Sequence, residues 1–383
     1  MNSVFVVYLA IYTIFAFGYI WYRYIFLLIL KERYFPFCTH KKVTVIVPFY
    51  NEKPLLIERT VRKINECYGK KQIIVIDDGS KSKESYNQLK KLKEEISFEL
   101  IRYDKNKGKR YAQSIGVKKA EGDIIITVDS DTILDKLAII NLIKPFSDKK
   151  IGATTGQVRV LNRNENLLTK MQSARYFNAF NFERNSQSKF SALTCLSGPI
   201  SAYRKEILLK IMDDYTTQTF LGIKCTYGDD RHLTTLILKN GFKVYYVKDA
   251  IAYTEVPNSF KKLISQQIRW KKSFLRENYL VSKFMFKRSK ALSFEIFITT
   301  FIIFFSLFAR VFLVISLFVV PFFFLLIIPM ILFMSTLHSL YILFYKPNDF
   351  FYSILYSFLH VFVIYWLIFI ALFTLKDNRW GTR

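Results

Sequence analysis

The sequence predicts a doubly wound, Rossmann-like α/β domain joined to a bundle of transmembrane helices. Three observations support this fold class. Short apolar runs ending in acidic residues alternate with helical patterns in the middle of the chain. Residues 4–22 and 291–375 are long apolar blocks with few charges. With 51% hydrophobic residues among 383, the chain can bury a core and still supply membrane spans.

Three apolar runs predict buried parallel strands that end in polar loops. Residues 43–52 run into the loop Tyr50–Glu52, residues 72–80 end on Asp77 and Asp78, and residues 123–132 end on Asp129 and Asp131. Helical stretches, 57–67 and 83–96, lie between and after the first two runs. Since βαβ units form parallel sheets that bind ligands beyond the carboxyl ends of their strands, the three acidic loops should meet at one edge.

The spacing Asp129-Ser130-Asp131 predicts a metal and nucleotide site. Two carboxylates two residues apart at a strand end can both reach a divalent cation, and that cation can bridge the phosphates of a nucleotide. Oxygen ligands suit Mg²⁺ or Mn²⁺. Such an ion would stabilise a leaving diphosphate as a Lewis acid.

Two further positions are candidate nucleotide ligands. Asp78 precedes a glycine, so it is either a turn residue or a hydrogen-bond acceptor for the base or ribose. Lys109 and Arg110 follow Gly108 between the second and third predicted strands. This position favours contact with a nucleotide over a solvated basic face.

Adjacent carboxylates in TYGDDRHLT, residues 226–234, open a predicted helix. Asp229 could cap this helix, because aspartate is favoured there. Asp230 is the candidate general base, which would deprotonate an acceptor hydroxyl as it attacks an anomeric carbon. Both are therefore candidate catalytic residues, whereas His232 is interpreted as a residue of the helix face.

Residues 258–277 predict a basic amphipathic helix lying on the membrane, with apolar residues at helical spacing and lysines mostly elsewhere. Trp270 is either an interface anchor or a flat surface for a sugar ring. Its neighbour Arg269 could pair with a diphosphate.

The formal net charge of +26 fits membrane flanks and a pyrophosphate-bearing substrate better than nucleic acid. Cytosolic flanks of membrane spans are rich in Lys and Arg, and anionic lipids attract basic surfaces. No nucleic-acid-binding motif accompanies the charge. The four cysteines show no CxxC or paired spacing, which argues against a disulfide scaffold or zinc site and fits a reducing cytosol.

The apolar blocks set the predicted topology. The first lacks a preceding basic stretch and a cleavage site, so it predicts an uncleaved helix with its N-terminus outside. The second has room for three or four spans, with breaks near Arg310, Pro321 and residues 346–349; its last part is one tilted span or an interfacial piece plus a shorter span. The predicted organisation is a multi-pass cell-membrane protein with an N-terminal transmembrane helix (1–30), a cytosolic domain (31–256), interfacial helices (257–290), transmembrane helices (291–375) and a tail (376–383).

Four motifs carry a family resemblance: VDSDT, LSGPISAYR (196–204), GDDRHLT and QQIRW, in this order. They resemble the processive, membrane-bound inverting glycosyltransferases of the cellulose, chitin and hyaluronan synthase group. Further stretches resemble single-polypeptide hyaluronan synthases of the streptococcal and vertebrate type: residues 106–113, 162–184, 218–223, the QQIRWKKSFLRE segment and the terminal WGTR (380–383). The resemblance covers residues 43–383.

This resemblance implies a GT-A fold for the cytosolic domain, UDP-sugar donors and Mg²⁺ or Mn²⁺ held by Asp129 and Asp131. The implied nucleotide-binding residues are Tyr50, Glu52, Asp78, Lys109, Asp129, Arg269, Trp380 and Arg383. The implied acceptor-binding residues are Cys195, Ser197, Gln266 and Trp270, although Cys195 could equally be a small buried residue. Many relatives begin with two N-terminal spans, whereas this sequence shows one.

The implied activity is hyaluronan synthesis. UDP-GlcNAc and UDP-GlcA would be the donors, and the growing polysaccharide chain would leave through the protein's own channel among membrane lipids, with no nucleic acid involved. A chitin-oligosaccharide or other capsular polysaccharide synthase is the close alternative. A transporter or a nucleotide-sensing scaffold without catalysis is a different class, and the four carboxylates at 129, 131, 229 and 230 weigh against it.

Overall fold

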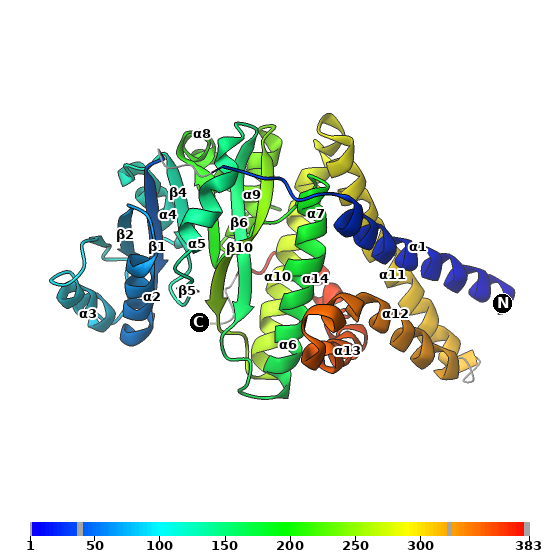
Figure 1. The fold of residues 1–383 in the computed structure, drawn as a ribbon. Coiled ribbons are helices and arrows are strands. Elements are labelled where there is room, and N and C mark those ends of the chain that lie inside the picture. Colours follow the sequence, from blue (N-terminus) through cyan, green and yellow to red (C-terminus); the bar gives the residue numbers. More distant parts are fainter. Residues whose placement is uncertain (1, 37–40, 320–323, 379–383) are drawn as a thin grey trace.

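The computed structural model describes residues 2–36, 41–319 and 324–378. An α/β domain forms one side of the molecule, and helices α1, α11 and α12 extend from its other side (Figure 1). The helix α10 lies between these two parts.

In the described chain, eight strands form the main sheet in the order β3-β2-β1-β4-β7-β6-β10-β5. The predicted parallel strands are confirmed, since β1 pairs in parallel with both β2 and β4. The strand β7 is antiparallel to both of its neighbours, β4 and β6, which makes the sheet mixed beyond its doubly wound first half. The strands are β1 (Val43–Phe49), β2 (Gln72–Asp77), β3 (Glu99–Arg102), β4 (Ile124–Val128), β5 (Ile133–Leu134), β6 (Ile151–Val160), β7 (Ile200–Arg204) and β10 (Lys243–Thr254), with a separate hairpin of β8 (Thr219–Phe220) and β9 (Ile223–Lys224).

Both faces of the sheet are covered, as the continuous apolar runs predict. Val45 and Val47 of β1 point into one core with α2, α3 and α5, while Ile46 between them points into the other core with α4, α8 and α9. This alternation follows from the two-residue period of a strand. The helices are α2 (Pro54–Glu66), α3 (Glu84–Leu92), α4 (Lys109–Lys119), α5 (Ala138–Ile143), η1 (Lys144–Ser147), α6 (Leu167–Phe177), η2 (Asn178–Arg184), α7 (Asn185–Lys189), α8 (Lys205–Thr216) and α9 (Asp229–Lys239).

Three described segments are long and apolar enough to cross a membrane: Lys290–Phe308, Ile328–Tyr345 and Pro347–Phe373. Thr13–Ile29 of α1 is apolar but shorter. The break expected near Arg310 is wrong, because α11 continues through it, whereas the break at residues 346–349 is confirmed; Pro321 lies outside the described residues. The elements are α1 (Asn2–Ile29), α10 (Phe260–Ser282), η3 (Met285–Lys287), α11 (Lys290–Val319), α12 (Phe324–Tyr345), η5 (Pro347–Asp349), α13 (Phe350–Leu359), η6 (His360–Ile364) and α14 (Leu367–Phe373).

A buried ion pair joins the first helix to the bundle. Arg23 of α1 pairs with Glu295 of α11, and the side chains are 1% and 0% exposed. The hydroxyl of Tyr22 also donates to Glu295, at 2.6 Å. Side chains 272 positions apart in the sequence thus meet inside the protein.

The predicted amphipathic helix is α10, but its buried face is not mainly apolar. Lys272, Ser273, Arg276 and Glu277 are all buried where α10 packs against the α/β domain and α14. Trp270 is 43% exposed. The second half of α10 therefore meets the rest of the protein through buried polar side chains as well as apolar ones such as Leu275 and Val281.

Candidate active site

The loops after β1, β2 and β4 meet at one sheet edge, as expected from the sequence. Ser130 Oγ donates to Glu52 Oε2 at 2.7 Å, which joins the loop after β1 to the loop after β4. The Asn51 N–H donates to Ser80 Oγ at 2.8 Å, which joins the loop after β1 to the loop after β2. Tyr50 lies at the same edge and is partly buried.

The carboxylate of Asp78 organises the loop before α4. It accepts hydrogen bonds from the N–H groups of Lys107 (2.9 Å) and Gly108 (2.8 Å) and from Asn106 Nδ2 (2.9 Å). Burial raises the pKa of Asp78, although these two backbone N–H groups favour its charged form. Asp78 thereby fixes the backbone from which Lys109 projects.

Lys109 and Asp129 form an ion pair across this edge, with Nζ 2.5 Å from Oδ1. The two side chains are 26% and 27% exposed. Burial opposes the charge of the lysine, but Asp129, Asp229 and Asp230 hold the pKa of Lys109 above its ordinary value. Two predicted nucleotide ligands are therefore in contact.

The segment 195–198 links this edge to α9. A Cβ atom at Gly198 would lie 3.0 Å from Asp129 Oδ2, so the segment passes directly over that carboxylate. The Leu196 N–H donates to Thr234 Oγ1 at 3.0 Å, and Thr234 Oγ1 donates to the Asp230 carbonyl at 2.7 Å. Segment 195–198 thus lies against the carboxylate of Asp129 and is hydrogen-bonded to the first turn of α9, which carries Asp230.

Ser197 and Cys195 have different surroundings within this segment. The Ser197 hydroxyl is buried 2.6 Å from Thr155 Oγ1, in a cluster with Ser201, which indicates a structural contribution. Cys195 is partly exposed, its thiol donates to the Leu196 carbonyl at 3.1 Å, and burial raises its pKa. Its thiol is accordingly neutral at physiological pH.

The adjacent carboxylates at the start of α9 face different environments. Asp229 Oδ1 accepts from Arg110 Nε at 2.7 Å, and both side chains are 6% exposed. It makes no side-chain cap, since the residue before the helix is Gly228. Asp230 is partly exposed, and burial raises the pKa of its carboxyl group. Asp229 is thus held in an ion pair, while the side chain of Asp230 is partly open to solvent.

Gly228 brings this carboxylate pair against α10. Its φ is +79°, in the left-handed region that favours glycine. A Cβ atom there would lie 2.1 Å from Ser273 Oγ and 2.7 Å from Arg276 Nη2. The motif GDD therefore needs its glycine for both backbone conformation and close packing on α10.

Asp129 and Asp131 fit a divalent cation that a nucleotide would share. Both carboxylates are partly exposed at the same strand end. Within the described ranges, no group of three or more His, Cys, Asp or Glu side chains gathers as a metal cage. Mg²⁺ is commonly held by one or two carboxylates with substrate phosphates completing its shell, so a two-carboxylate oxygen site is sufficient.

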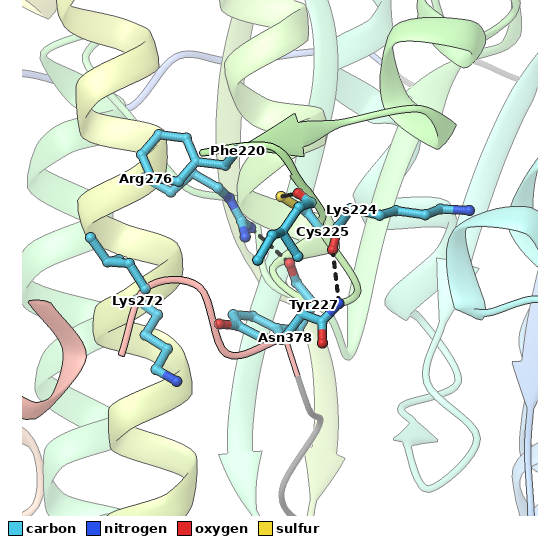
Figure 2. A pocket seen from close by; sticks show the side chains of 9 residues that line it. Phe220, Lys224, Cys225, Tyr227, Lys272, Arg276 and Asn378 are labelled. Atoms are coloured by element: carbon cyan, nitrogen blue, oxygen red, sulfur yellow. Dashed lines mark hydrogen bonds between the residues drawn. The ribbon is translucent and has the colours of Figure 1, made fainter. Parts of the chain in front are cut away.

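Residues 375–378 dock on the loop that leads into Asp229 (Figure 2). Asn378 Nδ2 donates to the Lys224 carbonyl at 3.2 Å, and the Tyr227 hydroxyl donates to the Asp377 carbonyl at 3.1 Å. A small pocket lies here, lined by Phe220, Ile223, Lys224, Cys225, Tyr227, Lys272, Arg276, Leu375 and Asn378. Trp380 and Arg383 lie outside the described residues, so their predicted roles remain predictions.

The remaining predicted ligands lie on α10. Gln266 and Arg269 are partly buried, and Trp270 is exposed. Sequence reasoning missed Glu277 and Gln218, which are buried near α9. Glu277 is the lone acidic residue in the basic segment 258–290, and this feature of the sequence could have indicated its importance.

Residues 40–273, more than half of the chain, match the family described as Glycosyltransferase like family 2. The chain belongs to glycosyltransferase family 2. Its α/β domain is therefore the transferase part, and the site at the sheet edge is the candidate active site of this transferase.

Curated relatives of this family 2 glycosyltransferase include N-acetylglucosaminyltransferases and a hyaluronan synthase. An N-acetylglucosaminyltransferase of Mesorhizobium japonicum is 39% identical over 62% of this chain and 57% of its own length. One of Azorhizobium caulinodans is 37% identical over 67% and 65%. A hyaluronan synthase of Streptococcus pyogenes is 33% identical over 89% of this chain and 83% of its own length. The chain thus spans less than two thirds of the first two relatives.

Among solved structures, a mannosyltransferase of Pyrobaculum calidifontis in complex with GDP-Man and Mn²⁺ is similar to the glycosyltransferase described here. Its TM-score is 0.66 at 19% identity, and the match covers 94% of this chain and 98% of that one. At this identity the similarity concerns the fold alone. The GT-A fold implied by the sequence resemblance is confirmed.

Proposed function

We propose that this glycosyltransferase is a processive, inverting polysaccharide synthase that uses UDP-sugars, with hyaluronan as its product. The observation that carries the proposal is the framework joining Lys109 and Asp129 to Asp230 through segment 195–198. This framework would bring a cation-binding carboxylate and a general base to one edge, as transfer from an activated sugar requires. The hyaluronan reading is favoured because the streptococcal relative matches 89% of the chain, including most of its apolar C-terminal part.

The donor side would be organised by residues of the sheet edge. The loop 50–52 and the loop fixed by Asp78 would enclose the nucleotide, and Lys109 would donate to its phosphates. Asp129 and Asp131 would hold Mg²⁺ or Mn²⁺, which when bound supplies Lewis-acid stabilisation to the leaving diphosphate. Arg269, Trp380 and Arg383 are proposed to contact the same nucleotide.

The acceptor side would be served by Asp230. Its carboxylate accepts the proton of the acceptor hydroxyl while that oxygen forms a bond to the anomeric carbon. The bond from this carbon to the diphosphate oxygen breaks, and the electron pair leaves with UDP. Attack opposite the leaving group inverts the anomeric centre. Asp229 would position this turn of α9 through its ion pair with Arg110.

The helices are proposed to place synthesis at a membrane. Three described segments are long and apolar enough to cross it, and we propose α1 as a further span. The sequence-based division, with a cytoplasmic transferase part at 31–256 and membrane helices at 291–375, remains our proposal. Gln266, Trp270 and Cys195 would contact the growing polysaccharide where it enters its export path.

A chitin-oligosaccharide synthase is the second candidate, because two of the relatives are named N-acetylglucosaminyltransferases. Purified full-length protein should be incubated with UDP-GlcNAc, UDP-GlcA or both, and products digested with hyaluronan lyase or chitinase. Polymer that requires both donors and is cut by the lyase supports hyaluronan. Chitinase-sensitive product from UDP-GlcNAc alone would replace it with the second candidate, and no incorporation from any mixture would contradict both.

A further inference from the structure

A buried network of polar and charged side chains lies where α9 packs on α10. Each member is at most 7% exposed. Four elements or their flanking loops contribute: α4, the loop after α8, α9 and α10. The members are Arg110, Gln218, Asp229, His232, Arg276 and Glu277.

Glu277 is the centre of this network. Its Oε2 atom lies 3.0 Å from His232 Nδ1, and its Oε1 atom accepts from Gln218 Nε2 at 2.8 Å and from Arg276 Nε at 3.0 Å. Burial opposes its charge, but hydrogen bonds and the charges of its neighbours lower the pKa of Glu277 to about 2. A carboxylate ionised at neutral pH thus bridges α10 to α9 and to the loop after α8.

The network continues from Glu277 to the donor side. Gln218 Oε1 accepts from Arg110 Nη1 at 2.9 Å, and Arg110 Nε reaches Asp229 at 2.7 Å. Arg110 directly follows Lys109, which pairs with Asp129. One series of contacts therefore runs from the donor edge, past the start of α9, to α10.

The loop before Asp229 is held from the same network. The Tyr227 carbonyl accepts from Arg276 Nη2 at 2.7 Å and from Arg110 Nη2 at 3.2 Å. Two arginines on different helices thus fix the peptide that precedes Gly228. The position of the carboxylate pair depends on both helices at once.

The energetics of buried charges indicate that this network positions the helices more than it stabilises the fold. Taking charges out of water costs free energy that their mutual attraction often only balances, so buried ion pairs are a poor source of stability. The hydrogen bonds in such pairs nonetheless have a well-defined geometry, because a carboxylate and a guanidinium bind their partners only in certain directions. A network of this kind determines where helices lie relative to one another.

We propose that Glu277 is a positioning residue for sugar transfer, setting α9 with Asp230 relative to α10 with the acceptor-binding residues. This role rests on the proposed function. Glu277 acts through His232, whose Nδ1 lies 3.0 Å from its Oε2, and through Arg276, which holds the loop at Tyr227. His232 is thus part of the support for the base.

The test is Glu277→Gln in the full-length chain, purified in detergent. Glutamine keeps the side-chain volume and one oxygen acceptor but removes the negative charge of the carboxylate that Arg276 and His232 both contact. Because misplacement of about 1 Å can cost roughly 100-fold in rate, we expect kcat to fall about 10- to 100-fold. The KM for each UDP-sugar and the UDP-binding stoichiometry should stay within about twofold, since the donor edge keeps its ion pair.

Two further variants separate positioning from folding. Glu99→Gln is the matched control, because Glu99 forms an ion pair with Lys119 on the exposed side of β3, at 2.8 Å; it should leave kcat unchanged. His232→Gln should lower kcat, and the double variant with Glu277→Gln should lose no more than the worse single variant, because the two side chains act as a unit.

The outcomes separate the two levels of the proposal. Wild-type protein that incorporates no sugar would refute the proposed function and this role with it. Active wild type with an unchanged kcat in Glu277→Gln would overturn the positioning role alone. The positioning role would also be overturned if the variant lost activity only because fewer of its molecules bind UDP, with kcat per UDP-binding site unchanged. That result would indicate a purely structural contribution of Glu277.

Discussion

Asp129 lies between the two halves of the site: Lys109 Nζ is 2.5 Å from its Oδ1, while Gly198 approaches so closely that a Cβ atom there would lie 3.0 Å from its Oδ2. The first contact comes from the start of α4 on the donor side, and the second from the segment bonded to α9. The carboxylate is therefore held between the elements proposed to bind donor and acceptor.

Lys109→Met should weaken donor binding with little effect on folding. The ion pair is partly exposed, so its contribution to stability is at most about 1 kcal/mol. A charged hydrogen bond to phosphate contributes about 1.5–3 kcal/mol, so KM for UDP-sugars should rise about 10- to 100-fold. Lys119→Met, at the other end of α4 and 50% exposed at its side chain, is the control. Equal KM values in both variants would contradict the assignment.

Asp230→Asn should lower kcat by about 10²- to 10⁴-fold, the range of a lost general base, while UDP still binds. In the wild type, burial raises the pKa of Asp230 above 3.8. The base works only when ionised, so activity should fall as pH drops through that raised pKa. Asp214→Asn, exposed near Lys239, should leave the pH–rate profile unchanged. A normal polymer yield from the Asp230 variant would remove the assigned base.

Gly228→Ala should lower both the melting temperature and the activity. The left-handed backbone costs alanine about 1–2 kcal/mol, and overpacking against Ser273 and Arg276 adds about 1–3 kcal/mol. Gly222→Ala is the matched control: its φ is +80°, but a Cβ atom meets nothing within 4 Å. In detergent, the melting temperature of Gly222→Ala should be well above that of Gly228→Ala. Equal losses of melting temperature in the two variants would show that packing on α10 does not matter.

Removal of divalent cations should stop sugar transfer. Excess EDTA should abolish incorporation, and added Mg²⁺ or Mn²⁺ should restore it, because the proposed ligands Asp129 and Asp131 would provide only part of a metal shell. Asp131→Asn, which loses one anionic ligand, should require a higher cation concentration for half-maximal rate. Glu121→Gln, an exposed acidic residue before β4, is the control. Undiminished turnover in EDTA would contradict the metal site.

The sequence predicted which loops meet at this edge of the sheet, because the information for it is local. Continuous apolar runs predicted β1, β2 and β4, and parallel pairing then brought Asp78, Lys109 and Asp129 to one edge. Contacts between side chains that are far apart in the chain leave no such local pattern in the sequence. Arg110 and Asp229 are 119 positions apart, and Gln218 and Glu277 are 59 apart, so neither contact follows from residue spacing. The antiparallel β7 was missed because a short apolar run carries no sign of strand direction.

The ion pair between Arg23 and Glu295 has a consequence for how the protein is assembled. The two residues are 272 positions apart, so at about 5–20 residues per second Arg23 is made roughly 15 to 55 s before its partner. An unpaired charge among apolar helices is costly, so we expect α1 to take its final place only after the start of α11 has been synthesised. Closure of this pair would then report that α1 has packed against α11, which makes Glu295 a natural position for a probe of this assembly step.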